Sequence, residues 1–388
     1  MNWNQYSVQE LIDKGWLEEP LDGNHGSLHP KSSDYVDKGI PFIMANDLQN
    51  GVVDFSNCAF ITEKQASGLR KGFSHPGDVL LTHKATIGRT AIVPNTYTTI
   101  VLTPQVTYYR VKDEIDNRYL KYYFDSPFFQ SILNNWAGAG STRAYLGIMA
   151  QRKLPIVLPD YRTQKEISTV LGLIDDKIET NRRINYNLEQ QGMLLFKAWF
   201  VDYLPFGGIL PLEWKEYRLG TFLPVITGKK NANVSSDTGK YPFFSCSQDF
   251  AWTDNYSFDG NAILVAGNGD FNVKFFSGKF EAYQRTYVLI PYNPRYTAWL
   301  YYAVKYNLSI ITIAARGSVI KFITKGNLEN FTFFAPQELD DCRIIDVFSS
   351  INQAIAANRK EIEKLSLLRD ALLPRLMSGE IDVSNIAV

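Results

Sequence analysis

Basic and hydrogen-bonding side chains lie on two glycine-containing stretches of this sequence. Residues 82–89 read Thr-His-Lys-Ala-Thr-Ile-Gly-Arg, and residues 266–274 read Ala-Gly-Asn-Gly-Asp-Phe-Asn-Val-Lys. Glycine lets a backbone turn tightly and approach another molecule closely. Lysine, arginine and asparagine donate hydrogen bonds to phosphates and to base edges. Both stretches therefore have the composition of a loop that contacts nucleic acid.

Further basic loops follow this pattern. Residues 140–143 read Gly-Ser-Thr-Arg, residues 315–318 read Ala-Arg-Gly-Ser, and residues 228–231 carry two adjacent lysines. A single basic residue in a surface loop is usually only solvated, and Asn-Gly is first of all a turn former. Because the loops recur at corresponding places, we predict that they contact DNA. The predicted contact residues are Lys84, Arg89, Arg143, Lys229, Lys230, Asn268, Lys274, Arg316 and Lys321.

The recurrence extends along the chain. Trp3–Val8 is matched by Trp214–Leu219, Gly39–Ile43 by Lys240–Phe244, and Gly77–Leu81 by Gly260–Leu264. Residues 140–146 match residues 317–323 at an offset of 177. Since all these matches keep one order, the sequence predicts two copies of one unit, each a globular domain followed by a long helix.

Short apolar runs between glycine, asparagine and proline predict strands in each globular domain. They are 78–81, 90–93, 105–110 and 154–158 in the first copy, and 262–266, 274–276, 287–290 and 331–334 in the second. Apolar residues at helical spacing predict one helix over 116–124 and another over 294–306. The predicted fold class is therefore α+β, with two similar mixed α/β domains.

Two heptad stretches predict long helices, from Pro159 to about Asp202 and from Pro336 to about Ser378. Their seam positions alternate at spacings of four and three residues, as in a coiled coil. The first seam is Ile167, Leu171, Ile174, Ile178, Asn181, Asn185, Leu188, Gly192, Leu195 and Trp199. Adding 177 gives the second, which is Ile344, Phe348, Ile351, Ile355, Asn358, Ile362, Leu365, Arg369, Leu372 and Leu376.

A polar residue lies near the middle of each seam. Asn181 is at the midpoint of the first helix, and Asn358 holds the corresponding place in the second. In an antiparallel pair the midpoints meet, so we expect the two amides to face one another and to fix the register, because a slipped amide would lack a hydrogen-bond partner. The alternative is that both amides point into solvent or toward a partner subunit.

Charge is balanced over the chain, with 40 basic and 40 acidic residues, but it is unevenly distributed. Six basic residues and only Asp78 lie between Lys64 and Arg110, and residues 209–330 hold 13 basic and 9 acidic residues. Residues 336–388 hold nine acidic and six basic residues. A basic surface confined to the globular domains fits phosphate binding, although charge also varies along chains that bind no nucleic acid.

Several classes of protein find little support. No apolar run is long enough to span a membrane and the start does not read as a signal peptide, so we expect a cytoplasmic protein. Cys58, Cys246 and Cys342 lack metal-binding spacing and predict free thiols, and the loop holding His25 and His29 offers no further ligand. Signatures of an amino-methyltransferase and of an ATP phosphate loop are absent, so we expect neither a catalytic residue nor a cofactor in this chain.

The helical segments closely resemble the conserved regions of type I restriction-modification specificity subunits. The residues that carry the resemblance are Asp175–Asn181, Leu195–Asp202 and Leu372–Ile381. The resemblance implies two target recognition domains held apart by an antiparallel coiled coil, in a pseudo-two-fold repeat. The implied boundaries are 1–157 and 204–334 for the domains, and 158–203 and 335–388 for the helices. The family's usual helix start is kept at 159–167 but reads Pro-Gln-Glu-Leu-Asp-Asp-Cys-Arg-Ile at 336–344, which affects the local cap.

The resemblance also implies a function without catalysis. Each domain would read one half-site of a bipartite double-stranded DNA target. Two methylation subunits would transfer a methyl group from S-adenosylmethionine to adenine N6, and two restriction subunits would use ATP and Mg²⁺. An enzyme with its own methyltransferase site would need a further domain. A structural adaptor with protein-binding heads is the remaining alternative, and DNA binding in the presence of methylation subunits distinguishes it.

The predicted helices determine the spacing between the half-sites. A helix of roughly 40 residues is about 60 Å long, at a rise of about 1.5 Å per residue, and half-sites on one face of DNA lie about 34–36 Å apart. Inserting one heptad in both helices should lengthen the preferred spacer and leave both half-sites unchanged, as measured by methylome sequencing. A changed half-site with an unchanged spacer would contradict this prediction.

Overall fold

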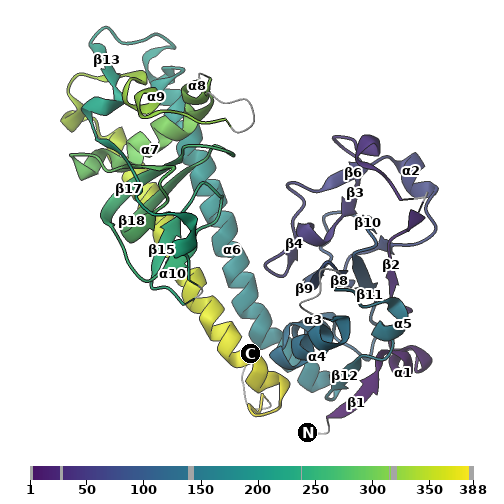
Figure 1. Ribbon diagram of the computed structural model, residues 1–388. Coiled ribbons are helices and arrows are strands. Elements are labelled where there is room, and N and C mark those ends of the chain that lie inside the picture. The colour runs from purple at the N-terminus through teal and green to yellow at the C-terminus, as the bar shows by residue number, and fades with distance from the viewer. Residues whose placement is uncertain are drawn as a thin grey trace. The chain divides into compact units, whose positions relative to one another are not determined.

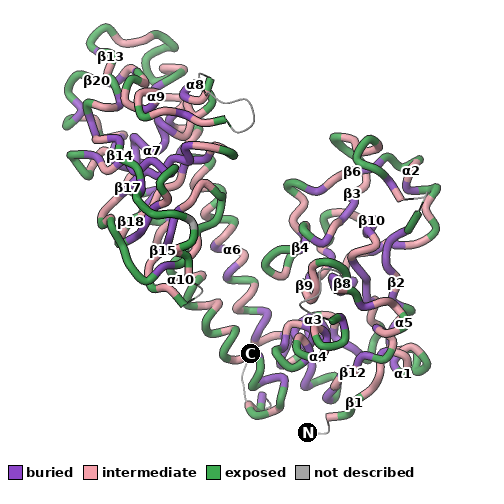
Figure 2. The backbone as a smooth tube through the Cα atoms, in the orientation of Figure 1, coloured by how far each residue is buried: buried purple, intermediate pink, exposed green. Residues whose placement is uncertain are grey.

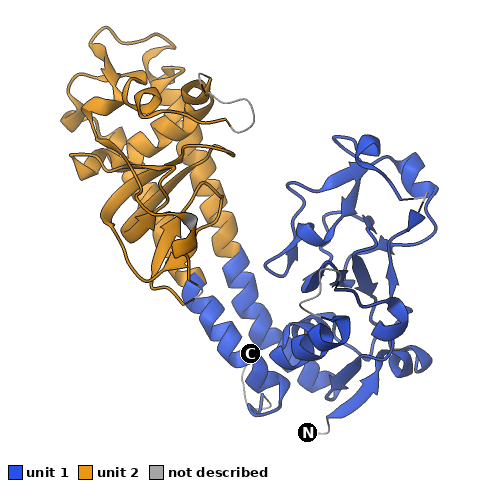
Figure 3. Ribbon diagram, in the orientation of Figure 1, with its two compact units in different colours: residues 1–179, 363–388 blue, residues 180–362 orange. Residues whose placement is uncertain are grey.

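The computed structural model describes residues 3–26, 29–138, 144–236, 238–313, 315 and 321–383, apart from the side chain of Ala232. The chain forms two compact units, which are described separately (Figure 3). Unit 1 consists of residues 1–179 and 363–388, and unit 2 of residues 180–362. Each unit therefore contains one globular domain and a part of each long helix, α6 (Tyr161–Phe200) and α10 (Ile344–Met377).

The remaining elements of unit 1 are short (Figure 1). Its strands are β1 (Asn4–Ser7), β2 (Leu21–Asp22), β3 (Ile40–Ile43), β4 (Leu48–Gln49), β5 (Val52–Val53), β6 (Ala59–Ile61), β7 (Phe73–Ser74), β8 (Val79–Lys84), β9 (Thr86–Ile92), β10 (Ile100–Leu102), β11 (Val106–Tyr109) and β12 (Pro155–Leu158). Its helices are α1 (Val8–Asp13), α2 (Glu63–Ser67), α3 (Asn117–Asp125), α4 (Pro127–Ala137) and α5 (Ile148–Gln151).

Unit 2 has fewer and longer strands. They are β13 (Trp214–Arg218), β14 (Val225–Thr227), β15 (Tyr241–Phe244), β16 (Ala251–Thr253), β17 (Phe258–Ala266), β18 (Val273–Ala282), β19 (Thr286–Leu289) and β20 (Thr332–Pro336). Its helices are α7 (Thr297–Tyr306), α8 (Leu308–Thr312) and α9 (Lys325–Glu329). All eight strands and both short helices predicted from the sequence are present, with ends that differ by a few residues or more.

The two units share one sheet topology. Unit 2 has a six-stranded sheet in the order β14-β19-β17-β18-β15-β16, and unit 1 has the sheets β2-β11-β8-β9 and β6-β3-β10-β7. Strand β18 pairs with β17 at its start and, in parallel, with β15 at its end. In unit 1 the two pairings of β18 are divided between two strands. Strand β9 pairs with β8, and β10 pairs in parallel with β3. Both units also pair the first strand of the domain with the last, β1 with β12 and β13 with β20.

Backbone hydrogen bonds at the hairpin turns repeat in the same way. In unit 1, Ala85 N donates to Ala144 O (3.1 Å) and Leu146 N donates to His83 O (2.9 Å). In unit 2, Gly269 N donates to Lys321 O (3.1 Å) and Ile323 N donates to Gly267 O (3.0 Å). The central turn residue has a positive φ in both hairpins, 64° at Ala85 and 70° at Gly269. The internal repeat predicted from the sequence is therefore confirmed at the level of individual hydrogen bonds.

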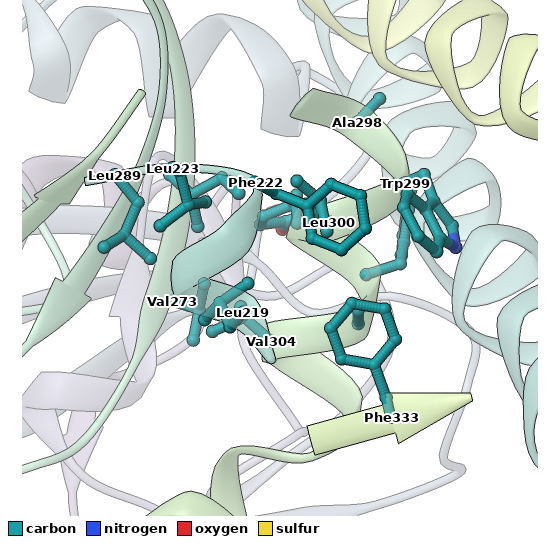
Figure 4. Packing of buried hydrophobic residues seen from close by; sticks show 14 of the residues in the cluster. Leu219, Phe222, Leu223, Val273, Leu289, Ala298, Trp299, Leu300, Val304 and Phe333 are labelled. Carbon is teal, nitrogen blue, oxygen red and sulfur yellow. The ribbon is translucent and has the colours of Figure 1, made fainter. Parts of the chain in front are cut away.

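Each unit has its own apolar core, and exposed residues lie outside it (Figure 2). The core of unit 2 packs α7 against β17 and β18 and includes Trp299, which is fully buried against the rings of Phe222 and Phe333 (Figure 4). In the main core of unit 1, apolar residues of the globular domain pack with residues in the last turns of α10, including Leu373 and Leu376. Among the described residues, no helix is long and apolar enough to cross a membrane.

The seam positions of both long helices are buried or half-buried, which confirms the heptad reading. The predicted start of the second helix is wrong, however. Helix α6 begins at Tyr161, where Asp160 accepts a hydrogen bond from Thr163 N (2.9 Å), but α10 begins only at Ile344. Buried Gln164 accepts a hydrogen bond from Asp116 N and donates to Pro159 O, which holds the first turn of α6 in place. The corresponding residue in the second copy is Asp341, which lies in a 3₁₀ turn before the helix.

The two central asparagines do not pair with one another as predicted. Asn181 Nδ2 donates to Glu361 Oε2 (2.9 Å), and Asn358 Nδ2 donates to Asn185 Oδ1 (2.9 Å). These contacts show that the helices run antiparallel within unit 2. Asn358 lies three residues from Glu361, or about one helical turn from the expected position. Asn181 is 1% exposed, so its amide is satisfied inside the seam and not by solvent.

A tyrosine hydroxyl joins the short helix of each domain to a long helix. Tyr122 on α3 donates to Asp175 Oδ2 on α6 (2.8 Å). Tyr302 on α7 donates to Asn352 Oδ1 on α10 (3.1 Å). Asp175 and Asn352 are 177 residues apart, so the two contacts are copies of one another. In unit 1 the Asp175 carboxylate also accepts from Arg369 Nη1 on α10 (3.1 Å).

The carboxylate of Asp175 should stabilise unit 1 in a pH-dependent way. Burial raises its pKa, but the Lys121 ammonium, the Tyr122 hydroxyl and Arg369 lower it, and the net shift is downward. A lowered pKa adds stability above the ordinary aspartate value of about 4, and this stability is lost as the pH falls through the folded-state value. Asp175→Asn should therefore lower the free energy of unfolding by about 1–3 kcal/mol at pH 7, and by less near pH 3.

Urea unfolding at both pH values measures this difference. Asp176→Asn is the matched control, because Asp176 pairs with Arg118 at the surface, where side chains are 59% and 44% exposed. An exposed ion pair contributes less than about 1 kcal/mol. Equal losses for the two variants, or a loss that does not depend on pH, would contradict the role of Asp175.

Candidate nucleic-acid interface

The β8-β9 hairpin of unit 1 carries two of the predicted DNA contacts. Lys84 ends β8 and is exposed, and its Nζ lies 6.0 Å from the ring centre of Tyr145. Arg89 is exposed on β9, and its Nη1 donates to the carbonyl oxygens of Ala45 and Leu48 (3.4 Å each). The remaining donors of the guanidinium make no hydrogen bond to the residues that the structure describes. The hairpin thus carries two exposed cations, and the segment after β3 holds one edge of the Arg89 guanidinium in place.

The corresponding region of unit 2 gathers exposed cations from separate segments. Lys229 and Lys230 follow β14 and are exposed, and Lys230 O accepts from Gln284 N (2.9 Å). Lys321 is also exposed and is bonded through its carbonyl to the hairpin turn. Asn268 is half-buried and forms a bridge with Phe322. The topology therefore brings together four residues that the sequence separates by up to 92 positions.

Lys274 was predicted to contact DNA, but its ammonium forms hydrogen bonds within the protein. Its Nζ donates to Ser247 O (2.6 Å) and to Asn272 Oδ1 (2.5 Å), and the side chain is half-buried. Burial lowers the pKa of Lys274. The ammonium therefore holds the loop after β15, as Arg89 does for the loop after β3. Arg143 and Arg316 lie outside the described residues.

Two exposed side chains beside these cations were not among the predicted contacts. Gln284 and Arg285 form the turn between β18 and β19. They line a pocket of about 350 Å³ together with Thr227, Gly267, Tyr287 and Ile323. The sequence gives only a weak signal for this pocket, because its walls come from four segments spread over almost 100 residues.

Unit 1 has a partly buried polar cluster at the corresponding position, in which Asp22 and His83 are buried and His25 is exposed. Asp22 on β2 bonds to Lys71, and His25 Nε2 lies 2.8 Å from Asp22 Oδ2. His83 is fully buried, its Nδ1 lies 3.0 Å from Leu146 O, and its Nε2 lies 4.0 Å from Asp22. Burial lowers the pKa of His83 to about 4, against the opposing effect of Asp22, so the imidazole is neutral near pH 7. Among the described residues, no group of three or more potential ligands could hold a metal ion.

This arrangement suits recognition of a polyanion. Lysine ammonium groups contact phosphates, whereas arginine and amide side chains also match base edges. The exposed cations are presented by turns that backbone hydrogen bonds hold in both units, so little ordering is needed on binding.

Comparison with known proteins gives a consistent result. The family model described as "Type I restriction modification DNA specificity domain" matches residues 2–190 and again residues 211–367. The EcoDI specificity subunit of Escherichia coli is 35% identical over 178 residues, which cover 45% of this chain and 40% of that one. The MjaIX specificity subunit of Methanocaldococcus jannaschii is 26% identical over 92% of this chain and 90% of its own length.

A solved structure shows the same fold. The S subunit of a type I restriction-modification system from M. genitalium matches 97% of this chain and 96% of its own with a TM-score of 0.59, at 16% identity. The family model covers most of both halves, and the two halves share strand order, hairpin hydrogen bonds and a tyrosine contact to a long helix. The chain therefore belongs to the family of type I restriction-modification DNA specificity domains, and it contains two copies of that domain.

Proposed function

We propose that this chain is the DNA-recognition subunit of a type I restriction-modification enzyme. One domain reads each half-site of a bipartite double-stranded target, and the chain carries no catalytic residue of its own. The observation that carries the proposal is the twofold match to the specificity-domain family, with exposed cations on the β8-β9 hairpin of unit 1 and on separate segments of the corresponding region of unit 2. Related chains that match are named specificity subunits.

Other subunits supply the chemistry in this proposal. Two methylation subunits transfer a methyl group from S-adenosylmethionine to adenine N6, and two restriction subunits use ATP and Mg²⁺ in the cytoplasm. This chain selects the sequence at which they act. Its exposed lysines supply phosphate contacts, which make the affinity dependent on salt.

Expression of the chain with its methylation subunits tests the proposal. Methylome sequencing should show one bipartite adenine-methylated motif, and a gel shift with the same complex should retain DNA that carries this motif. Expression of the methylation subunits alone is the control and should leave the motif unmethylated. Sequence-independent retention, or a motif that does not require this chain, would instead favour a structural adaptor.

Arg89 and Lys274 should behave differently when replaced. If Arg89 reads a guanine, Arg89→Ala should cost about 1–3 kcal/mol in binding and relax one position of the first half-site. If it contacts phosphate, binding should weaken on all sequences, and the slope of log affinity against log salt should fall by about one. Lys274→Ala should leave the salt slope unchanged, because its ammonium already bonds within the protein.

Salt titrations of DNA binding by the purified complex measure these slopes. Lys229→Ala is the control, because Lys229 is exposed and should lower the slope by about one if it contacts phosphate. An unchanged affinity and motif for Arg89→Ala would remove Arg89 from the interface. A lowered slope for Lys274→Ala would show that its ammonium is released to DNA.

A further inference from the structure

The pocket beside Arg285 is built as a rigid frame. Gly267 N donates to Arg285 O (2.8 Å), and Ile323 N donates to Gly267 O (3.0 Å). The Tyr287 hydroxyl donates to Ile323 O (2.9 Å), so the ring forms a fixed wall. A Cβ at Gly267 would lie 2.4 Å from Arg285 O and 2.9 Å from the Tyr287 ring. The pocket therefore requires glycine at this position.

The corresponding place in unit 1 is closed by a side chain. The shared hairpin bonds match His83 with Gly267 and Leu146 with Ile323, and the bond of His83 N to Gln105 O matches that of Gly267 N to Arg285 O. His83 takes the place of the glycine, and its imidazole lies against Leu146 O, where unit 2 has the Tyr287 hydroxyl. Thr107 stands where Tyr287 does, which leaves room for the imidazole. The two domains thus share the same backbone hydrogen bonds here, but unit 2 has an open pocket where unit 1 has a buried imidazole.

The polar side chains at the pocket are exposed and available. Neither the guanidinium of Arg285 nor the amide of Gln284 forms a hydrogen bond or ion pair with any residue in the described part of the chain. The backbones of Lys230 and Lys321 adjoin segments that line the pocket, because Lys230 O accepts from Gln284 N (2.9 Å) and Lys321 lies two residues before Ile323. An unpaired arginine fork matches the O6 and N7 acceptors of guanine, and exposed lysines are suited to contact phosphates.

We propose that Arg285 is the residue with which unit 2 reads a guanine in its half-site, with Gln284 beside it at the pocket rim. Unit 1 cannot use the corresponding position in this way, because Gln105 replaces the arginine and His83 fills the space. The proposal rests on the proposed function, since it assumes that the chain recognises DNA. It adds a specificity-determining side chain that lies on neither hairpin turn.

Methylation of a plasmid library with a randomised target tests this assignment in the complete complex with methylation subunits. Arg285→Ala should relax one guanine position of the second half-site, with about a 5- to 150-fold loss of discrimination. The first half-site should stay unchanged, which also reports that the complex has assembled. Arg285→Gln should shift the preference at the same position toward adenine, because glutamine matches adenine N6 and N7. Arg218→Ala is the control, since Arg218 is exposed on β13, away from the pocket lining, and should leave the motif intact.

Three results would overturn the assignment. The first is an unchanged motif in both Arg285 variants. The second is equal weakening on all sequences with a lower salt slope, which would mean a phosphate contact. The third is loss of methylation at every sequence by both variants in complexes that still assemble. Failure of the proposed function itself would be seen separately, because the unmodified chain would then direct no sequence-specific methylation.

Discussion

Attachment of each globular domain to a long helix is the constraint on which the rest of the structure depends. In each unit the core of the domain packs against the long helices, and one tyrosine hydroxyl forms a hydrogen bond across this junction. In unit 2 the Tyr302 ring lies over the seam at Gly192, where a Cβ would approach it to 2.3 Å. In unit 1 the corresponding seam position is Arg369, which bonds to the same carboxylate as Tyr122. At matching seam positions, Gly192 thus leaves room for the ring of Tyr302, whereas Arg369 bonds to the carboxylate that Tyr122 also contacts.

The sequence predicted the repetitive parts of this structure well, because repetition is a local signal. Heptad spacing identified both seams, and short apolar runs between glycine, asparagine and proline identified the strands. The pairing of Asn181 with Glu361 was not predicted, because the expected midpoint of the second helix assumed a start at Pro336, whereas α10 begins only at Ile344. The late start of α10 has a local cause, since Asp341 cannot make the contacts that buried Gln164 makes in α6.

Prediction of the candidate site was less complete for a physical reason. Charge and glycine content select turns, and they found Lys84, Lys229 and Lys321, which the structure shows to be exposed. They cannot tell a free ammonium from one that bonds within the protein, as Lys274 does. They also missed Arg285, because its pocket depends on a glycine and a tyrosine at positions that only the folded sheet brings together. Matching the two halves of the chain residue by residue would have drawn attention to it.

The composition of unit 1 has a consequence for how the chain is made. Its main core joins Val8 and Leu11, which precede unit 2 in the chain, to Leu373, Leu376 and Met377, which follow it. Unit 2 consists of one continuous stretch, residues 180–362, and holds all of its core residues once these have left the ribosome. During translation the first domain therefore waits with part of its apolar surface uncovered, while the second completes its fold. Unit 1 should therefore be completed only after the last turns of α10 have been synthesised, although most of it precedes unit 2 in the chain.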